Sequence, residues 1–172
     1  MAARSWGACL DASTVDRPRL ESLSRRAIAL GSVRELTPAD AEAILRLDAS
    51  TRLAYPGGIA TAHSPLTLAT ATVSTHRRAF GVERDGDLIA MSFVDLHPDH
   101  AETDFTVVAR EWRGRGLGQA IKAASVLALL DGGVTRFRTG GSAENAASIA
   151  SNRAVSYVLD EEWLTFVPPA AG

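Results

Sequence analysis

The sequence contains one cysteine, no long hydrophobic run and no excess of charge of either sign. Cys9 has no second cysteine with which to form an internal disulfide and lies far from every motif, so we do not expect a catalytic thiol. The longest apolar helical run, residues 123–130, is far shorter than the ~20 residues that cross a bilayer. Residues 1–10 show no secretory signal. Eighteen basic and 20 acidic residues leave a net charge of −2, so we expect no nucleic acid and no membrane partner. The single cysteine favours a reducing compartment, so we expect a cytoplasmic protein.

The most informative segment, Val107–Gly118, reads Val-Val-Ala-Arg-Glu-Trp-Arg-Gly-Arg-Gly-Leu-Gly. β-Branched and apolar residues at 106–109 predict a strand, and apolar residues at helical spacing from Leu117 onward predict a helix after the glycines. The first N–H groups of a helix lack intrahelical partners, so they can converge on an anion, and glycine lets a phosphate approach. Arg113 and Arg115 add positive charge. A tight strand-to-helix connection with no ligand would use the same residues.

The residues after the glycines exclude two familiar phosphate loops. A P-loop requires Lys and then Ser or Thr after its last glycine, but Gln119 and Ala120 come after Gly118. A dinucleotide-binding turn requires Gly-x-Gly-x-x-Gly, and the spacing of residues 114–118 is different. A nucleotide triphosphatase or a Rossmann dehydrogenase is therefore not expected.

The Arg-x-x-Gly-x-Gly pattern after a Val-rich strand resembles the pyrophosphate loop of the GNAT acetyltransferase superfamily. A second block, residues 139–157, resembles the fifth strand of that family and the loop and helix after it. Many members carry Thr, then Asn, then a second Asn seven residues later, and end in Gly-Phe. Here Asn145 and Asn152 match the two Asn positions, and Ser156-Tyr157 stands in the Gly-Phe place. A helix capped by Ser142 would explain much of this block alone, but both blocks in this order favour the family over roughly residues 32–167.

This resemblance implies an α/β GNAT fold, in which a mixed, largely antiparallel sheet has splayed parallel fourth and fifth strands and is flanked by helices. It implies acetyl-CoA as co-substrate and no metal, with the pantetheine arm lying in the gap of the sheet like an extra strand. Val107 and Val108 would also serve as ordinary sheet core. The implied cofactor-binding residues are Thr106, Val107, Val108, Arg113, Gly114, Arg115, Gly116, Leu117, Gly118, Asn145 and Asn152.

The implied reaction transfers an acetyl group from acetyl-CoA to an amine of a small molecule or peptide. A base must remove a proton from the ammonium form of the acceptor, and Glu102 and Asp104 alternate onto one strand face where several members place a carboxylate. Strand-end carboxylates are also commonly just solvated. His97 and His100 are further candidates, although their loop position favours a surface role. Backbone N–H of the bulged fourth strand, near Val108, would stabilise the oxyanion.

One position departs from the family pattern. Many members place a tyrosine on the helix after the fifth strand to protonate the departing thiolate, and Asn152 stands in that place. Asn is no general acid, but it can donate a hydrogen bond to the sulfur or the pantetheine. Tyr157, the nearest phenol, occupies the usual core Phe position. The general acid is therefore absent, a water, or a residue that the sequence does not identify.

We expect residues 1–31 to be an N-terminal helical extension, with a helix over 17–30, and residues 32–172 to be the acetyltransferase domain. Asp85-Gly86 predicts a hairpin turn, and the loop over 49–64 is expected to line the acceptor site. The predicted strands are 32–36, 79–83, 88–96, 102–109, 134–139 and 163–167, and the predicted helices are 37–47, 65–77, 117–130 and 145–156.

Two other classes of function stay open. One is a non-catalytic acyl-CoA-binding or regulatory domain, which the missing tyrosine favours. The other is a phosphate- or nucleotide-binding module without thioester chemistry. A variant of the enzyme hypothesis makes this domain one half of a duplicated acetyltransferase, with residues 1–31 as a connecting helix. The acceptor is not identified by the sequence, and a homodimer stays open as well.

Overall fold

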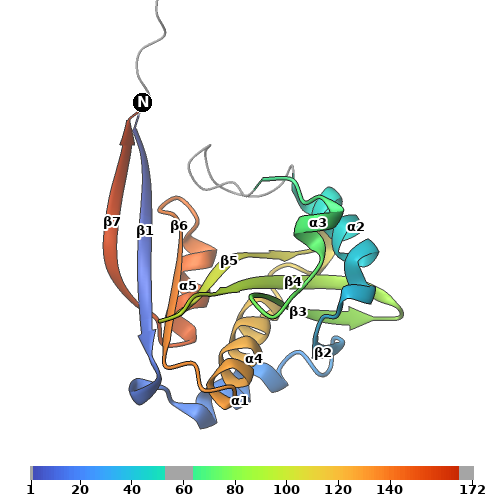
Figure 1. Ribbon diagram of the computed structural model, residues 1–172, viewed down its shortest axis with the longest axis horizontal. Helices are drawn as coiled ribbons and strands as arrows, with labels where there is room; N and C mark the ends of the chain where they lie inside the picture. The colour runs from blue at the N-terminus through green and yellow to red at the C-terminus, as the bar shows by residue number, and fades with distance from the viewer. Residues whose placement is uncertain (1, 53–63, 167–172) are drawn as a thin grey trace, which may run out of the picture.

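A computed structural model describes residues 2–52 and 64–166, which form one seven-stranded sheet with helices on both faces (Figure 1). In chain order the strands and α-helices are β1 (Ala2–Asp11), α1 (Arg17–Arg25), β2 (Ser32–Glu35), α2 (Ala41–Thr51), α3 (Leu68–Ala71), β3 (Arg77–Arg84), β4 (Asp87–Leu96), β5 (Ala101–Val108), α4 (Leu117–Asp131), β6 (Arg136–Ser142), α5 (Ala146–Ala154) and β7 (Val158–Phe166). Short 3-10 turns lie at Ala12–Thr14, Pro38–Asp40 and Arg110–Trp112.

The strand order is β2-β3-β4-β5-β6-β1-β7, and the pairs are antiparallel except for β5 and β6, which run parallel. The parallel pair is short, because its register extends only from Ala101 opposite Phe137 to Thr103 opposite Thr139. Beyond this point β5 continues to Val108 without a β6 partner. The sheet therefore opens between two strands in its middle.

Two hydrophobic cores lie on the two faces of the sheet. One joins α1, α4 and α5 to the sheet and contains buried residues such as Leu20, Ile121 and Phe137. The other joins α2 and α3 to the opposite face around Ile44, and Phe93 stacks on Phe105 with ring centroids 5.1 Å apart. Figure 1 shows α4 and α1 covering one face, with α2 and α3 on the other. Each face of the sheet is therefore covered by its own helices.

The N-terminal residues differ from the expected helical extension. The predicted helix is present as α1, but residues 2–11 form β1, which lies inside the main sheet between β6 and β7. Trp6, Ala8 and Leu10 alternate into the core, and the Trp6 indole N–H donates to the Ser142 carbonyl at 3.0 Å. The sequence pattern did not predict this strand, since small residues interrupt its apolar alternation and its partners lie more than 120 residues away along the chain.

Other predicted elements are confirmed with changed bounds, but the helix predicted over residues 65–77 is wrong over most of its length. The helix expected over 65–77 is reduced to α3, closed at its start by a Thr67–Thr70 capping box, and Arg77 already belongs to β3. β6 begins later than expected and includes Gly140. At this position the Cβ of any other residue would lie 2.8 Å from the Trp6 carbonyl oxygen. The closing strand β7 begins at Val158 instead of residue 163.

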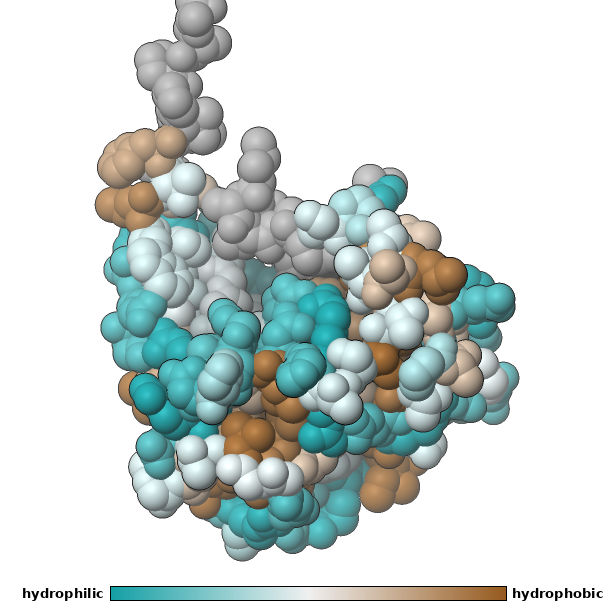
Figure 2. Space-filling view, viewed as in Figure 1, coloured by the Kyte–Doolittle hydropathy of each residue, from teal (hydrophilic) through white to brown (hydrophobic). Residues whose placement is uncertain are grey.

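β7 is the outer strand of the sheet and carries exposed apolar side chains. Trp163, Leu164 and Phe166 are 47%, 56% and 74% exposed, and Figure 2 shows apolar surface at this end of the β1–β7 ribbon. None of the helices within residues 2–52 and 64–166 is long and apolar enough to span a membrane.

Candidate active site

The glycine loop leads directly into α4 and leaves room for a ligand. Gly114 and Gly116 have φ angles of 73° and 81°, and a Cβ added at either would meet nothing within 4 Å. Gly116 is also the N-cap of α4, so no cap side chain covers the first N–H groups of this 15-residue helix. An open helix start of this kind attracts a phosphate through its N–H groups and its dipole. Only glycine adopts this turn at low cost while leaving the approach clear.

The two loop arginines have different partners. Arg113 donates from Nε to the Val108 carbonyl at 3.0 Å, which ties the loop to the end of β5. Arg115 stacks over the Trp112 ring at 4.9 Å, and Arg84 lies over the same ring at 5.0 Å. Both loop arginines are exposed. They place positive charge around the entrance to α4 without occupying it.

The opening between β5 and β6 presents backbone groups that have no strand partner. Across β4 and β5, the Ala109 N–H donates to the Ile89 carbonyl at 2.9 Å. Because successive residues of a strand direct their N–H and C=O groups to opposite edges, Thr106 and Val108 direct theirs toward the opening, whereas Val107 faces β4. The Val107 side chain is buried in the core beside α2 and α3. An extended ligand lying in this opening would find the partners that a β-strand offers, so the geometry fits the pantetheine arm of CoA.

A β-bulge lies at the point where the sheet opens. Phe93 pairs with Phe105 while Val94 pairs with Thr103, so Asp104 is the extra residue of β5. We expected a bulged strand with an oxyanion-stabilising N–H near Val108; the structure places the bulge at Asp104, four residues before Val108. The backbone N–H groups near an oxyanion would therefore come from the segment just after Asp104.

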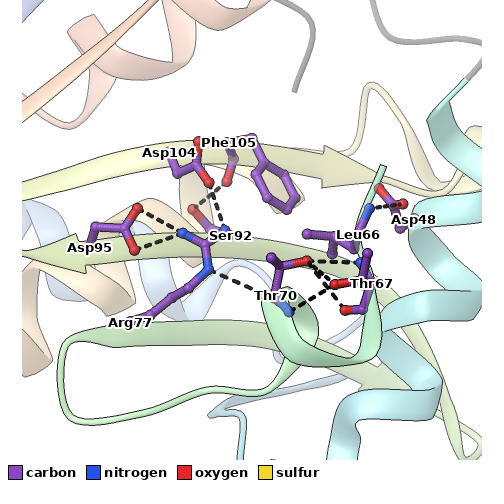
Figure 3. A network of polar contacts seen from close by, with 9 residues as sticks. All are labelled: Asp48, Leu66, Thr67, Thr70, Arg77, Ser92, Asp95, Asp104 and Phe105. Atoms are coloured by element: carbon purple, nitrogen blue, oxygen red, sulfur yellow. Dashed lines mark hydrogen bonds and ion pairs between the residues drawn. The ribbon is translucent and has the colours of Figure 1, made fainter. Parts of the chain in front are cut away.

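The carboxylate of Asp104 is anchored by an arginine (Figure 3). Arg77 donates from Nη2 to Asp104 at 2.7 Å and from Nη1 to both oxygens of Asp95 at 2.7 Å, while its Nε reaches the Thr70 carbonyl at 3.2 Å. Its guanidinium lies 4.7 Å from the centre of the Phe93 ring. Asp104 therefore lies on the sheet face covered by α2 and α3.

Glu102 lies on the same face, beside the hairpin between β4 and β5. Its Oε2 is 3.7 Å from His97 Nε2 and 3.8 Å from His100 Nε2, and Asp99 hydrogen-bonds His100 Nδ1 at 2.8 Å. His97, His100 and Glu102 are the one set of His and acidic side chains in the described part of the chain that is close enough to share a metal ion. The two imidazole rings are stacked with an interplanar angle of 19°. An imidazole binds metal in its own ring plane, so stacked rings must turn before they can share an ion.

The two asparagines of the second block use their amides within the protein. Asn145 is the N-cap of α5, in the place expected for Ser142, and its Oδ1 accepts from Ser148 N at 3.0 Å. Asn152 is fully buried; its Nδ2 donates to the Ser148 carbonyl at 3.0 Å and its Oδ1 accepts from Lys122 Nζ at 2.6 Å. Asn152 therefore points toward α4, where Lys122 lies.

Lys122 was not among the site residues predicted from the sequence. It is the one lysine in a chain with 18 basic residues, and it is 6% exposed in the middle of α4. Burial lowers the pKa of its ammonium group to about 8. Its uniqueness was a signal in the sequence, but the helix pattern alone does not show which face of α4 is covered.

Ser156-Tyr157 stands where many family members have Gly-Phe, and its backbone begins with a conformation typical of glycine. Ser156 has φ 75°, a left-handed value that glycine adopts freely and serine does not. Tyr157 is buried, and this burial raises the pKa of its phenol. A hydrogen bond with Thr103 has the smaller, opposite effect on that pKa. A phenol of raised pKa in the core is a poor proton donor, in agreement with a structural role for Tyr157.

Part of the expected acceptor site lies outside the described residues, since residues 53–63 belong to the loop predicted over 49–64. At the described end of this loop, Asp48 is buried and its Oδ2 accepts from Leu66 N at 3.1 Å. This contact fixes the C-terminal half of α2 against the segment that enters α3.

The fold and site define a class of protein: an α/β domain whose sheet opens between two parallel strands, beside a glycine loop that starts a central helix. The chain belongs to the acetyltransferase (GNAT) family, whose model matches residues 45–151. The expected GNAT fold, with a mixed sheet and a parallel pair in its middle, is confirmed. A search of curated proteins found no significant match.

Solved structures show the same fold at low sequence identity. A GCN5-related N-acetyltransferase-like protein from Streptococcus suis is 15% identical with a TM-score of 0.70, over 95% of this chain and 60% of its own. A tandem GNAT protein of the clavulanic acid biosynthesis pathway, in a structure without acetyl-CoA, is 22% identical with a TM-score of 0.64, over 94% and 52%. An aminoglycoside acetyltransferase from an uncultured soil sample, in complex with trehalose, is 10% identical with a TM-score of 0.67, over 84% and 99%. This chain spans less than two thirds of the length of several of the solved structures that it matches.

Proposed function

We propose that this protein transfers the acetyl group of acetyl-CoA to a primary amine of a small molecule or peptide. The observation that carries the proposal is the open edge of β5 beyond Thr103, which ends at the glycine loop and at the uncapped start of α4. A diphosphate binds the helix start while the attached extended arm pairs with the strand. The thioester at the end of that arm then lies near the bulge at Asp104.

Asp104 and Glu102 supply the base on the α2–α3 side of the sheet. An alkylammonium has a pKa of about 10, so it must lose a proton before its nitrogen attacks the thioester carbon. Asp104 is nearer the opening, and Arg77 fixes the orientation of its carboxylate. Backbone N–H groups of β5 at the opening stabilise the oxyanion that forms on attack. The residues that touch the acceptor include the loop over 49–64 in this proposal.

Calorimetric titration with acetyl-CoA, with ATP and NAD as controls, tests the first half of the proposal. Selective binding of acetyl-CoA supports the site, and absence of binding in a folded sample overturns it. Release of CoA thiol in the presence of a panel of small amines and peptide N-termini then tests the transfer. The alternative, a non-catalytic acyl-CoA-binding domain, is favoured by the enclosed amide of Asn152; it predicts tight binding without release of thiol above the rate of spontaneous hydrolysis.

A further inference from the structure

The contact between α4 and α5 contains a second polar centre, which the proposed base does not use. Lys122 on α4 and Asn152 on α5 are joined by a 2.6 Å hydrogen bond, and both side chains are buried. Next to Asn152, the Ser151 hydroxyl is buried without a partner among the described residues, 3.8 Å from where a Cβ on Gly118 would lie. Buried polar groups are normally satisfied, so this crossing of α4 and α5 has unused hydrogen-bonding capacity.

This polar centre is connected to the point where the sheet opens. Thr103 is the last β5 residue paired with β6, and its side chain hydrogen-bonds the Tyr157 phenol. The Tyr157 N–H in turn donates to the Asn152 carbonyl at 3.1 Å. Asp104, by contrast, is held on the opposite face of the sheet by Arg77. A thioester bound at this point would have the Asp104 carboxylate on one face of the sheet, and the contacts through Thr103 and Tyr157 lead to the Lys122–Asn152 pair on the other.

We propose that Lys122 is the general acid of the reaction: it gives its ammonium proton to the sulfur of acetyl-CoA, and Asn152 orients it for that transfer. The assignment rests on the proposed acetyl transfer. It supplies the proton for the departing thiolate, which Asn152 itself cannot give. Attack by the free amine forms the new C–N bond and an oxyanion. Collapse of this intermediate breaks the C–S bond, and the electron pair moves to sulfur.

The protons balance without another reactant. The nitrogen that attacked loses one proton to the base, and the sulfur takes one from Lys122 and leaves as the thiol. Lys122 is left as a neutral amine, which is tolerable in a buried site. It regains a proton from solvent before the next turnover. For an acceptor that starts as an ammonium ion, the overall reaction releases one proton.

The chemistry of the group suits this step. Lysine can lose a proton whereas the 17 other basic residues are arginines, which remain charged. With its pKa lowered to about 8, Lys122 is close to a thiol of pKa about 8.5, and proton transfer is most efficient between groups of similar pKa.

The surroundings of Lys122 are otherwise uncharged within the described residues. On α5 its hydrogen-bond partner is the Asn152 amide, which also contacts Ser148. Tyr157, which hydrogen-bonds Thr103 of β5, is buried and its pKa is raised. Glu102 and Asp104 of β5 lie on the other face. On α1, Arg17, Arg19 and Arg25 are exposed and Glu21 is half-buried. Arg17 pairs with Asp131 and Arg25 with Glu21, while Arg19 donates to the Ala154 carbonyl at the end of α5. Burial, with no carboxylate partner, therefore sets the protonation of Lys122.

The first test uses the fact that the chain has one lysine. Protein labelled with carbon-13 in lysine shows a single side-chain signal, whose pH titration we expect to have a midpoint near 8. Saturation with CoA should raise the midpoint by about one pH unit, because a neighbouring thiolate favours the ammonium form. Desulfo-CoA, which binds through the same phosphates but has no sulfur, should leave the midpoint unchanged. Equal midpoints with CoA and desulfo-CoA would overturn the assignment.

The second test is kinetic. Lys122→Met should lower kcat by about 100-fold or more while the dissociation constant of acetyl-CoA changes little. The wild-type rate should fall as pH rises through the lysine pKa, and this fall should be absent in the variant. Lys122→Arg keeps a donor for Asn152 but cannot release a proton, so it should be as slow as Lys122→Met. Ser125→Ala, which removes another buried polar group from α4, is the matched control and should keep the wild-type rate.

The outcomes separate the two proposals. Wild-type rates in Lys122→Met, or full rescue by Lys122→Arg, would overturn the role of Lys122 and leave acetyl transfer intact. Failure of the wild-type protein to bind acetyl-CoA would overturn the proposed function and the Lys122 assignment together. If Lys122→Met does not fold, the titration of the wild-type lysine signal decides.

Discussion

Arg77 and Asp104 form a 2.7 Å ion pair at the bulge of β5, where the sheet opens. The same guanidinium also binds Asp95, so it is held by two carboxylates and packed on the Phe93 ring. This arrangement fixes the direction of the Asp104 carboxylate without enclosing it, since Asp104 stays exposed. Of the two expected bases, Asp104 is therefore the better placed.

We predict that Asp104→Asn lowers kcat for amine acetylation by about 100-fold, because the amide cannot accept the ammonium proton. Glu102→Gln should have a smaller effect, since Glu102 lies beside the two hairpin histidines. Acetyl-CoA affinity, measured by calorimetry, should be nearly unchanged in both. Rates equal to wild type at every pH in both variants would remove the carboxylates from the mechanism.

We predict that Gly116→Glu weakens acetyl-CoA binding by about 100-fold, or about 2.7 kcal/mol, because a side chain and a negative charge would meet the pyrophosphate. Gly86→Glu is the matched control, since Gly86 also has a positive φ, 87°, and open space around it, but lies in the β3–β4 turn. Calorimetry of the two folded variants makes the comparison. Equal affinities would mean that the glycine loop is only a turn.

We predict that Ser156→Gly stabilises the protein by about 1 kcal/mol, because glycine relieves the left-handed φ of 75°. Ser156→Ala retains the strain and should give no stabilisation. Urea unfolding at pH 7 measures both. A loss of stability in the glycine variant would show that the Ser156 side chain matters more than its backbone strain.

We predict that Trp6→Ala destabilises the protein by about 3–5 kcal/mol, since it empties a buried site and removes the bond to the Ser142 carbonyl. Trp163→Ala, on the adjacent strand β7, removes the same side chain from a position that is 47% exposed, and should cost about 1 kcal/mol or less. Equal unfolding midpoints in urea for the two variants would contradict the place of β1 in the sheet.

Asp40 gives a prediction for the pH dependence of stability. The Arg34 guanidinium and the Thr37 backbone hold the pKa of Asp40 well below its ordinary value. The stabilisation that Asp40 contributes is therefore complete above about pH 3.9, the pKa of its carboxyl group in the unfolded chain. It is lost as the pH falls below that value. Asp40→Asn should lower stability at pH 7 by about 1 kcal/mol, allowing for the partial exposure of Arg34. Urea unfolding at pH 7 and pH 3 should show a smaller pH effect in the variant than in wild type.

Local patterns in the sequence determined much of the fold. The Asp85-Gly86 turn, the strands on either side of it and the long helix after the glycine loop were predictable because each depends on neighbouring residues: positive φ values, alternation and helical spacing. The glycine loop was predictable for the same reason, since its conformation depends on consecutive residues.

Tertiary structure alone decided the rest, because it depends on contacts between residues far apart in the chain. β1 enters the sheet through partners on β6 and β7, and no local pattern specifies them. The bulge at Asp104 follows from the register between two strands, which a single strand does not contain. Lys122 meets Asn152 from a helix 30 residues away, and its lowered pKa is a consequence of burial by the whole fold. The sequence by itself specified the glycine turn that precedes α4, whereas only the packed structure brings Lys122 and Asn152 together.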